Sequence, residues 1–292
     1  MIVARTPAEL ADALRASERP IGLVPTMGAL HAGHFALVAR ARAESATVVV
    51  SLFVNPLQFG PGEDFDRYPR AFESDIGALT QAGVDLVYAP DVATMYPPGF
   101  ATSVDPGPVA ERYEGELRPG HFRGVATVCV KLFSTVGAQR AYFGAKDAQQ
   151  VAVLRRVVAD LNLPVELVVC PTVREADGLA LSSRNVYLSP EERAAAPALH
   201  RALDAMVRAV QGGESDRARA VAAGRAELVE TTREAYLDLV DPRTFVPPER
   251  LVPPLLAIGS VRVGTTRLID NEPALRQAQD DRQAQDAMEG RR

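Results

Sequence analysis

The chain has 292 residues, a length that suggests about two domains, and its 47% hydrophobic and 24% charged residues are typical of a globular protein. Its net charge is −5 and it has no block of Lys and Arg, so nucleic acid is not an expected partner, because binding it needs a basic face. No apolar run approaches the length of a membrane span, and the N-terminal residues MIVARTPAEL lack the pattern of a signal peptide. Cys129 and Cys170 lie inside apolar runs and are expected to be buried thiols, which favours a cytoplasmic protein.

Strand-like and helix-like segments alternate over the first 172 residues. Thr6, Pro7 and Glu9 form a capping box that predicts a short helix. Apolar and β-branched runs predict strands at residues 21–26, 46–55, 84–90, 140–143 and 165–170. Further helices are expected near residues 34–44, 70–82, 124–136 and 147–160. This order predicts an α/β fold with a doubly wound, Rossmann-like parallel sheet over residues 1–172.

The pattern changes after residue 185. Ser189, Pro190 and Glu192 form a second capping box, which predicts a long alanine-rich helix to about residue 211. A second helix follows GGES, and strands are expected at residues 235–240, 255–263 and 266–270. Residues 173–272 are therefore expected to form a smaller α+β domain that acts as a lid. The tail at 273–292 contains RQAQD twice and few large apolar residues, so it is expected to be disordered.

Polar clusters follow the expected strands, and ligands of open parallel sheets bind beyond the carboxyl ends of the strands. In PTMGALHAGH, His31 and His34 flank the expected start of a helix, where backbone amides and the helix dipole favour an anion. Imidazoles there can donate hydrogen bonds to the charge that develops on a phosphate. Two alternatives remain: a pair of surface or capping histidines, and, as a minor option, a zinc pair without a third ligand.

Neutral amides form a second group of candidate residues. Asn55 and Gln58 follow the second expected strand, and Gln149 and Gln150 lie at a helix start after FGAKD. Amides donate and accept hydrogen bonds, so they suit the hydroxyl and carboxylate groups of a small substrate. The alternative for Asn55, which precedes Pro56, is that it shapes a turn.

Charged and hydroxyl side chains form a third group. Lys146 is placed to reach a phosphate, whereas Asp147 is suited to cap the helix or to bind a ribose hydroxyl or Mg²⁺. Ser182, Ser183 and Arg184 form a cluster of donors in a loop that either closes over a nucleotide or serves as a solvated linker.

Three further residues are less informative. Arg118 and His121 lie near a Pro-Gly pair and indicate either an anion-binding loop or only a turn. His200, inside the alanine-rich helix, is interpreted as structural.

Taken together, the clusters resemble a known family. PTMGALHAGH is similar to the HxGH signature of the nucleotidyltransferase superfamily. The order and spacing of further motifs over residues 1–272 resemble the pantothenate synthetase (pantoate–β-alanine ligase) family: FVNPLQFG, EDFDRYPR, RPGHFRGVATV, FGAKDAQQ, PTVREADGLALSSRN and GTTRLIDN. The resemblance implies a homodimeric ligase of pantothenate and coenzyme A biosynthesis that uses ATP and Mg²⁺. Pantoate would be converted to pantoyl adenylate and pyrophosphate, and attack by β-alanine would then give pantothenate and AMP.

The resemblance also carries site residues onto this chain. It implies catalytic roles for His31, His34, Lys146 and Arg184, with His34 as a proton donor. It places Gln58 on pantoate and β-alanine and Gln150 on pantoate, and we add Asn55 to the substrate contacts. The implied ATP contacts are Met27, Gly28, Ala29, Leu30, His31, Ala32, Gly33, His34, Gly144, Ala145, Lys146, Asp147, Val173, Leu181, Ser182, Ser183 and Arg184.

Two residues depart from the family pattern. Ala145 stands where the family often carries a glutamate, so a metal or ribose role of that carboxylate is absent here. Cys129 stands where a valine is usual, a change expected to be neutral.

Two rival functions are considered. Transfer of AMP onto a phosphorylated acceptor would need more Arg or Lys opposite the nucleotide, whereas Gln58 and Gln150 favour an uncharged polyol end. A nucleotide-sensing module without turnover would need a decayed substrate pocket, yet every polar cluster is intact.

Overall fold

The computed structural model describes residues 1–275 and divides into two compact units. The N-terminal unit comprises Met1–Val173 and Leu181–Ser183, and the C-terminal unit comprises Arg174–Ala180 and the residues from Arg184 onward. The chain therefore crosses between the units more than once over residues 174–183. The last strand continues to Leu275, so the first residues of the expected tail are extended in the sheet, and the RQAQD repeats lie outside the described residues.

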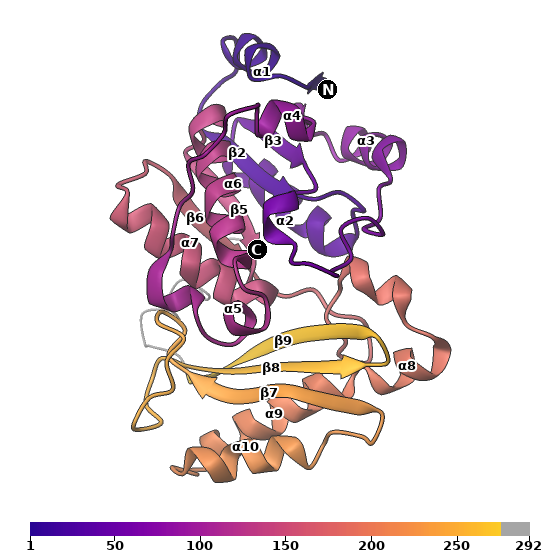
Figure 1. Ribbon diagram of the computed structural model, residues 1–292, viewed down its shortest axis with the longest axis vertical. Coiled ribbons are helices and arrows are strands. Elements are labelled where there is room, and N and C mark those ends of the chain that lie inside the picture. Colours follow the sequence, from indigo (N-terminus) through magenta and orange to yellow (C-terminus); the bar gives the residue numbers. More distant parts are fainter. Residues whose placement is uncertain (276–292) are drawn as a thin grey trace. The chain divides into compact units, whose positions relative to one another are not determined.

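The N-terminal unit is the predicted doubly wound α/β fold (Figure 1). Its six strands are all parallel and lie in the order β1-β4-β3-β2-β5-β6. They span β1 (Ile2–Ala4), β2 (Ile21–Thr26), β3 (Thr47–Leu52), β4 (Leu86–Tyr88), β5 (Arg140–Gly144) and β6 (Glu166–Cys170). The α-helices are α1 (Pro7–Leu14), α2 (Ala32–Glu44), α3 (Phe72–Gln81), α4 (Val92–Met95), α5 (Glu114–Leu117), α6 (His121–Val136) and α7 (Ala148–Asp160). Short 3₁₀ turns are η1 (Pro56–Gln58), η2 (Gly107–Ala110), η3 (Ala145–Asp147) and η4 (Ser183–Tyr187).

Both faces of this sheet are covered, as the continuous apolar strands predict. All six residues of β3 are buried. Val49 belongs to an apolar cluster with residues of α1, α6 and α7, whereas its neighbours Val48 and Val50 pack with residues of α2 and α3. Successive side chains of a strand point to opposite faces, so each β3 residue contributes to one of two cores.

The strand order defines where a ligand is expected. From β2 the chain moves through β3 to β4 on one side and then returns to place β5 on the other side of β2. Such a reversal separates the loops that follow the two neighbouring strands, and ligands bind in the crevice between them. The loops after β2 and β5 carry the residues around His31 and Lys146.

Most expected elements are confirmed, and several of their boundaries move. The helix α2 begins at Ala32 and α6 at His121, both earlier than the sequence suggested. The helix α6 starts after Gly120, whose φ of 84° ends the preceding turn in a conformation that glycine adopts readily. The elements β1, α4 and α5, each of only three or four residues, were not predicted from the sequence.

The C-terminal unit pairs an antiparallel sheet with helices, as expected for a small α+β domain. Its sheet has the order β7-β8-β9, formed by Thr232–Val240, Leu255–Val263 and Thr266–Leu275. The helices α9 (Ala198–Gln211) and α10 (Arg217–Arg225) cover one face of it (Figure 1). The expected single helix to residue 211 is wrong, because α8 (Pro190–Ala195) ends before Pro197, which has no N–H to continue an α-helix.

Two expectations from composition can be compared with the structure. Cys129 and Cys170 are buried free thiols, as predicted, and burial raises the pKa of Cys129 to about 12. Over residues 1–275, no helix combines the length and apolar character that crossing a membrane would require.

Candidate active site

His31 and His34 cap the helix α2 reciprocally. His31 is the N-cap residue, and its Nδ1 accepts a hydrogen bond of 3.2 Å from the backbone N–H of Gly33. The Nδ1 of His34 accepts one of 3.2 Å from the backbone N–H of His31. The two imidazoles thus form a capping box, an arrangement usually made by Ser or Thr with Glu. The capping alternative is therefore correct, and it leaves the second nitrogen of each ring available for another role.

The capping bonds determine which nitrogen of each ring carries the proton. A nitrogen that accepts a hydrogen bond is unprotonated, so the neutral forms of His31 and His34 carry their proton on Nε2. The ring centroids are 4.1 Å apart, so the site presents two neighbouring N–H donors. A Cβ on Gly33 would lie 2.9 Å from Cε1 of His31, so a side chain at position 33 would push against the His31 ring.

Burial keeps both imidazoles neutral. Burial lowers the pKa of His34 to about 3, and the proximity of His31 and Lys146 acts in the same direction while Asp147 opposes it. Burial, followed by the charge of Lys146, also lowers the pKa of His31. Near neutral pH both rings can therefore donate hydrogen bonds from Nε2, and neither holds an extra proton to release.

Lys146 and Asp147 lie beside the histidine pair. They belong to η3, directly after β5, and Lys146 Nζ is 3.4 Å from Asp147 Oδ1. Asp147 occupies the N-cap position of α7, but within residues 1–275 its side chain forms no capping bond, so the capping interpretation is wrong. Over the same residues, no group of three or more His, Cys, Asp and Glu side chains is placed to hold a metal ion, which leaves the zinc alternative without support.

The loop between β2 and α2 is held by Asp75, a residue that the sequence patterns did not indicate. The buried carboxylate of Asp75 in α3 accepts hydrogen bonds of 2.9 Å from Ala29 N–H and 3.0 Å from Leu30 N–H. Ala29 adopts a φ of 52°, which is rare for a residue with a side chain, so this loop needs such an anchor. An acidic residue in a first helical turn is usually explained by the helix dipole, so its sequence position gave no signal.

Asn55 acts within the protein. It is 1% exposed, and its Oδ1 accepts hydrogen bonds from Leu57 N–H and the Tyr96 hydroxyl at 3.3 and 2.7 Å. Its Nδ2 donates to Gln58 Oε1 at 3.0 Å and to the Gly124 carbonyl at 3.1 Å. These four bonds use the whole capacity of an amide, so the geometry supports the turn-shaping role over a substrate contact.

The three candidate glutamines, Gln58 on η1 and Gln149 and Gln150 on α7, differ in their hydrogen-bond partners. Gln58 Nε2 donates to Met27 Sδ at 3.2 Å, which brings two predicted site residues together. Gln149 is buried and bonds to the main chain of Glu114, Val109 and Arg112, so its role is structural. Gln150 lies next to it on α7 and remains a predicted pantoate contact.

Part of the predicted loop that contains Ser182, Ser183 and Arg184, here called the serine loop, belongs to the N-terminal unit. Leu181 N–H donates to the Val173 carbonyl at 3.0 Å, and a Cβ on Gly33 would lie 4.0 Å from the Leu181 Cβ. Ser183 Oγ lies 3.1 Å from the Tyr68 hydroxyl. The structure therefore brings Leu181 near the histidine turn. Arg184 belongs to the C-terminal unit, and its place at the phosphates stays a prediction, as does that of Ser182.

Arg118 and His121 do not form an open anion site. The guanidinium of Arg118 binds the carboxylate of Glu63 through two hydrogen bonds of 2.6 and 2.7 Å, which neutralises its charge. The anion-binding interpretation of this pair is therefore wrong.

The half-buried His34 and His121 predict acid sensitivity of folding. Burial lowers the pKa of His34 to about 3 and that of His121 to about 4, whereas an unfolded histidine titrates near 6.5. As the pH falls below about 6.5 the unfolded state binds more protons, so each group lowers the free energy of unfolding by up to roughly 1.4 kcal/mol per pH unit. Urea unfolding between pH 7 and 4 should show this loss. The double variant His34→Gln/His121→Asn should lose less stability over that range, and an unchanged slope would contradict the assignment.

Comparisons with known proteins agree on one family. A family model described as pantoate-beta-alanine ligase matches residues 2–273. A pantothenate synthetase of Roseiflexus sp. (strain RS-1) is 54% identical over 273 residues, which cover 93% of this chain and 98% of that protein. One from Thermus thermophilus is 56% identical over 269 residues, covering 91% and 96%.

Solved structures of similar proteins share the fold. A crystal structure of the Thermus thermophilus protein covers 94% of this chain and 99% of its own, with a TM-score of 0.89 and 54% identity. The pantoate-beta-alanine ligase of Francisella tularensis, complexed with beta-gamma ATP and β-alanine, has a TM-score of 0.76 and 30% identity, and covers 94% and 98%.

Proposed function

Because this chain belongs to the pantoate-beta-alanine ligase family and is therefore a ligase, we propose that it joins pantoate to β-alanine through pantoyl adenylate at the site around His31 and His34. In the first step, a carboxylate oxygen of pantoate attacks the α-phosphorus of ATP, and the bond to the β-phosphate oxygen breaks to release pyrophosphate. In the second, the amine of β-alanine attacks the acyl carbon, loses a proton and displaces AMP. The ligands carried by the Francisella tularensis relative support ATP and β-alanine as substrates.

One observation carries this proposal: two neutral imidazoles, fixed as Nε2–H donors by their capping bonds, lie at the start of a helix beside a lysine. Attack of a carboxylate on a phosphate brings negative charges together, so donors and cations must offset the repulsion. The two Nε2–H groups suit the phosphate oxygens, and Lys146 supplies positive charge. His34 then acts as a hydrogen-bond donor in place of the proton donor that the family resemblance implies.

Mg²⁺ fits this site as a companion of the nucleotide. Magnesium is usually held by one or two carboxylates together with substrate phosphates and water, so a cage of protein ligands is not needed. Asp147 has such a carboxylate, and it lies beside Lys146 at the start of α7. When bound with ATP, the ion would offset phosphate charge. We propose Asp147 as its protein ligand.

The substrate side of the site is proposed to rest on amides. Gln58 and Gln150 carry no charge, and amides bind the hydroxyl and carboxylate groups of pantoate without adding a cation that would favour a phosphorylated acceptor. This composition favours condensation over transfer of AMP onto a phosphate. The homodimer and the cytoplasmic location implied by the family resemblance remain proposals.

Two assays test the function. Exchange of labelled pyrophosphate into ATP should require pantoate and should proceed without β-alanine, because the first step is complete before the amine arrives. Release of AMP in amounts equal to the pantothenate formed should require ATP, pantoate and β-alanine together. Exchange without pantoate, or exchange that depends on a phosphorylated acceptor, would reject the proposed reaction.

A further inference from the structure

Two segments far apart in the sequence meet at the main chain of Gln58. Its carbonyl oxygen accepts a hydrogen bond of 3.1 Å from Arg118 Nη2 and one of 2.8 Å from His121 Nδ1. Gln58 ends η1, whereas His121 begins α6, and all three residues belong to the N-terminal unit. One carbonyl thus uses both of its lone pairs on side chains that come from another part of the fold.

The proton on His121 is fixed by Arg118. Arg118 Nη1 lies 3.0 Å from His121 Nε2, and a guanidinium only donates, so Nε2 must accept and the proton must be on Nδ1. Nδ1 then donates to the Gln58 carbonyl. His121 therefore has the opposite tautomer to His31 and His34. Burial lowers its pKa to about 4, and the charge of Arg118 acts in the same direction, so the ring stays neutral at neutral pH.

Glu63 holds the guanidinium that orients His121. Arg118 Nε donates to Glu63 Oε1 at 2.7 Å and Nη2 to Oε2 at 2.6 Å, and the Arg118 side chain is only 9% exposed. Burial would raise the pKa of Glu63, but its hydrogen bonds to Arg118 hold that pKa below the usual value. A bidentate pair of this kind fixes the plane of the guanidinium. Glu63, Arg118 and His121 therefore form one connected support under Gln58.

The side chain of Gln58 is held at its other end as well. Asn55 Nδ2 donates to its Oε1 at 3.0 Å, and its Nε2 donates to Met27 Sδ at 3.2 Å. The helix α6 approaches η1 so closely that a Cβ on Gly124 would lie 2.2 Å from the Leu57 carbonyl oxygen. A shift of the Gln58 backbone would therefore change where its amide points, because its side-chain bonds and the close packing of α6 against η1 restrict other adjustments.

We infer that Arg118 and His121 are positioning residues, which act on the substrate only through Gln58 by fixing its main chain. The inference rests on the proposed function, in which the Gln58 amide contacts pantoate and β-alanine. Neither residue is assigned a contact with ATP, so their loss should be felt by pantoate and β-alanine more than by the nucleotide.

His121 gives the matched test. His121→Phe removes one of the two donors to the Gln58 carbonyl, and we expect the KM for pantoate to rise about tenfold, the order of one lost hydrogen bond. The KM for ATP should change less than about twofold, because the Gln58 amide is proposed to contact pantoate and not the nucleotide. His121→Asn restores an amide N–H near the position of Nδ1 and should recover most of the loss. A merely structural role would affect both substrates and would not be rescued selectively.

The same measurements in a Gln58→Ala background separate the two proposals. Gln58→Ala alone should raise the KM for pantoate, and adding His121→Phe should then have no further effect, since the main-chain carbonyl no longer positions an amide. If Gln58→Ala leaves that KM unchanged, the substrate role of Gln58 fails and the inference fails with it. If Gln58→Ala has its effect but His121→Phe has none, or if the two effects add, only the inference is overturned.

A second variant covers the case in which His121→Phe does not fold. Arg118→Lys keeps the positive charge beside Glu63 but cannot bind that carboxylate and the Gln58 carbonyl together in one plane. We expect it to raise the KM for pantoate selectively as well, with thermal unfolding measured in parallel to confirm a folded protein. An equal rise in the KM for ATP, or no change in either, would contradict the positioning role.

Discussion

Replacing His34 by alanine should lower kcat by about 10²- to 10³-fold, the range found when one preorganised donor to developing charge is removed. His34 is half-buried, its Nε2–H is on the other side of the ring from the Nδ1 that accepts the capping bond, and its ring lies 4.1 Å from that of His31 between centroids. Such a donor stabilises charge that grows on phosphate oxygens more than charge already present in bound ATP. The loss should therefore appear in kcat for pyrophosphate exchange, with a smaller change in the KM for ATP.

His34→Gln is the control that separates a hydrogen-bond donor from an acid. Gln at this position of a helix completes a capping box, so its oxygen can accept the N–H of His31 while its amide N–H still donates. We expect this variant to lose only about tenfold in kcat, the order of one weakened hydrogen bond. An amide cannot release a proton, so equal rates for His34→Gln and His34→Ala would support the proton-donor role.

The pH profile gives a second test of the same point. Burial lowers the pKa of His34 to about 3, so the ring is already neutral across the working range of most enzymes. The pH profile of kcat/KM for ATP reports the ionising groups of the free enzyme. Between pH 6 and 9 we therefore expect the profiles of the wild type and of His34→Gln to have the same shape. A limb near pH 6.5 that is lost in the variant would mean that a protonated His34 takes part.

The N-terminal fold was predictable because its signals are local. Continuous apolar strands such as β3 indicate burial on both faces, and capping boxes such as that of Thr6 indicate helix starts. The split at Pro197 was missed because an alanine-rich run on both sides concealed a residue that ends α-helices. The strand order, which decides where the β2 and β5 loops lie, required the three-dimensional structure.

The sequence indicated several residues of the candidate site, but it did not give the role of each one. His31, His34, Lys146 and Gln58 were identified from polar clusters after strands. The sequence could not give the tautomers of the histidines, since these depend on capping bonds that form only in the folded turn. It also missed Asp75, which reaches Ala29 and Leu30 from 45 or more residues away, and Tyr68, which meets Ser183. Supporting residues of this kind are defined by tertiary contacts alone.

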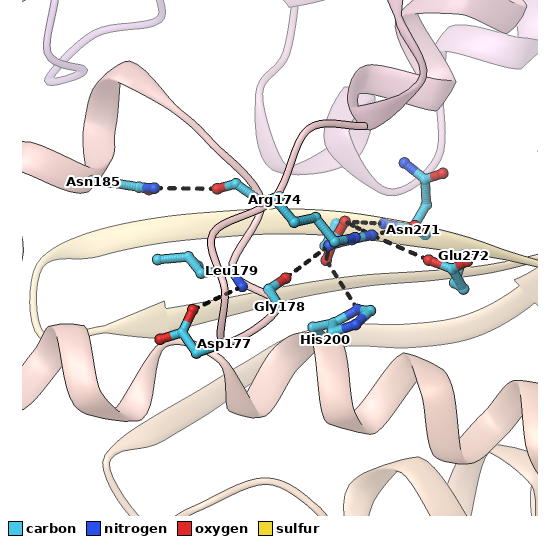
Figure 2. Close-up of polar contacts among 10 residues, drawn as sticks. Arg174, Asp177, Gly178, Leu179, Asn185, His200, Asn271 and Glu272 are labelled. Carbon is cyan, nitrogen blue, oxygen red and sulfur yellow. Dashed lines mark hydrogen bonds and ion pairs between the residues drawn. The ribbon is translucent and has the colours of Figure 1, made fainter. Parts of the chain in front are cut away.

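Replacing Asp270 by alanine should destabilise the C-terminal unit by up to about 3–5 kcal/mol, the cost of removing one partner of a largely buried ion pair. Asp270 lies in β9 and its side chain is 4% exposed, while Arg174, at 18%, binds it through hydrogen bonds of 2.6 and 3.0 Å. Figure 2 shows Arg174 close to Gly178, Asn271 and Glu272. The same guanidinium donates to the carbonyls of Gly178 and Asn271 at 3.1 and 3.3 Å. Without Asp270, Arg174 would keep only the partly exposed Glu272 as an anionic partner in this cluster.

Hydrogen exchange of the β8 and β9 amides measures this loss, because it reports the opening of one unit even when the two units unfold separately. Glu272→Gln is the matched control, since its side chain is 32% exposed and such pairs contribute about 0–1 kcal/mol. Loss of protection confined to Asp270→Ala would show that the buried pair anchors the segment Arg174–Ala180, which leads directly into Leu181 and the serine loop. Equal protection in the two variants would instead assign the stability of β9 to its apolar packing, and the segment before the serine loop would then need another anchor.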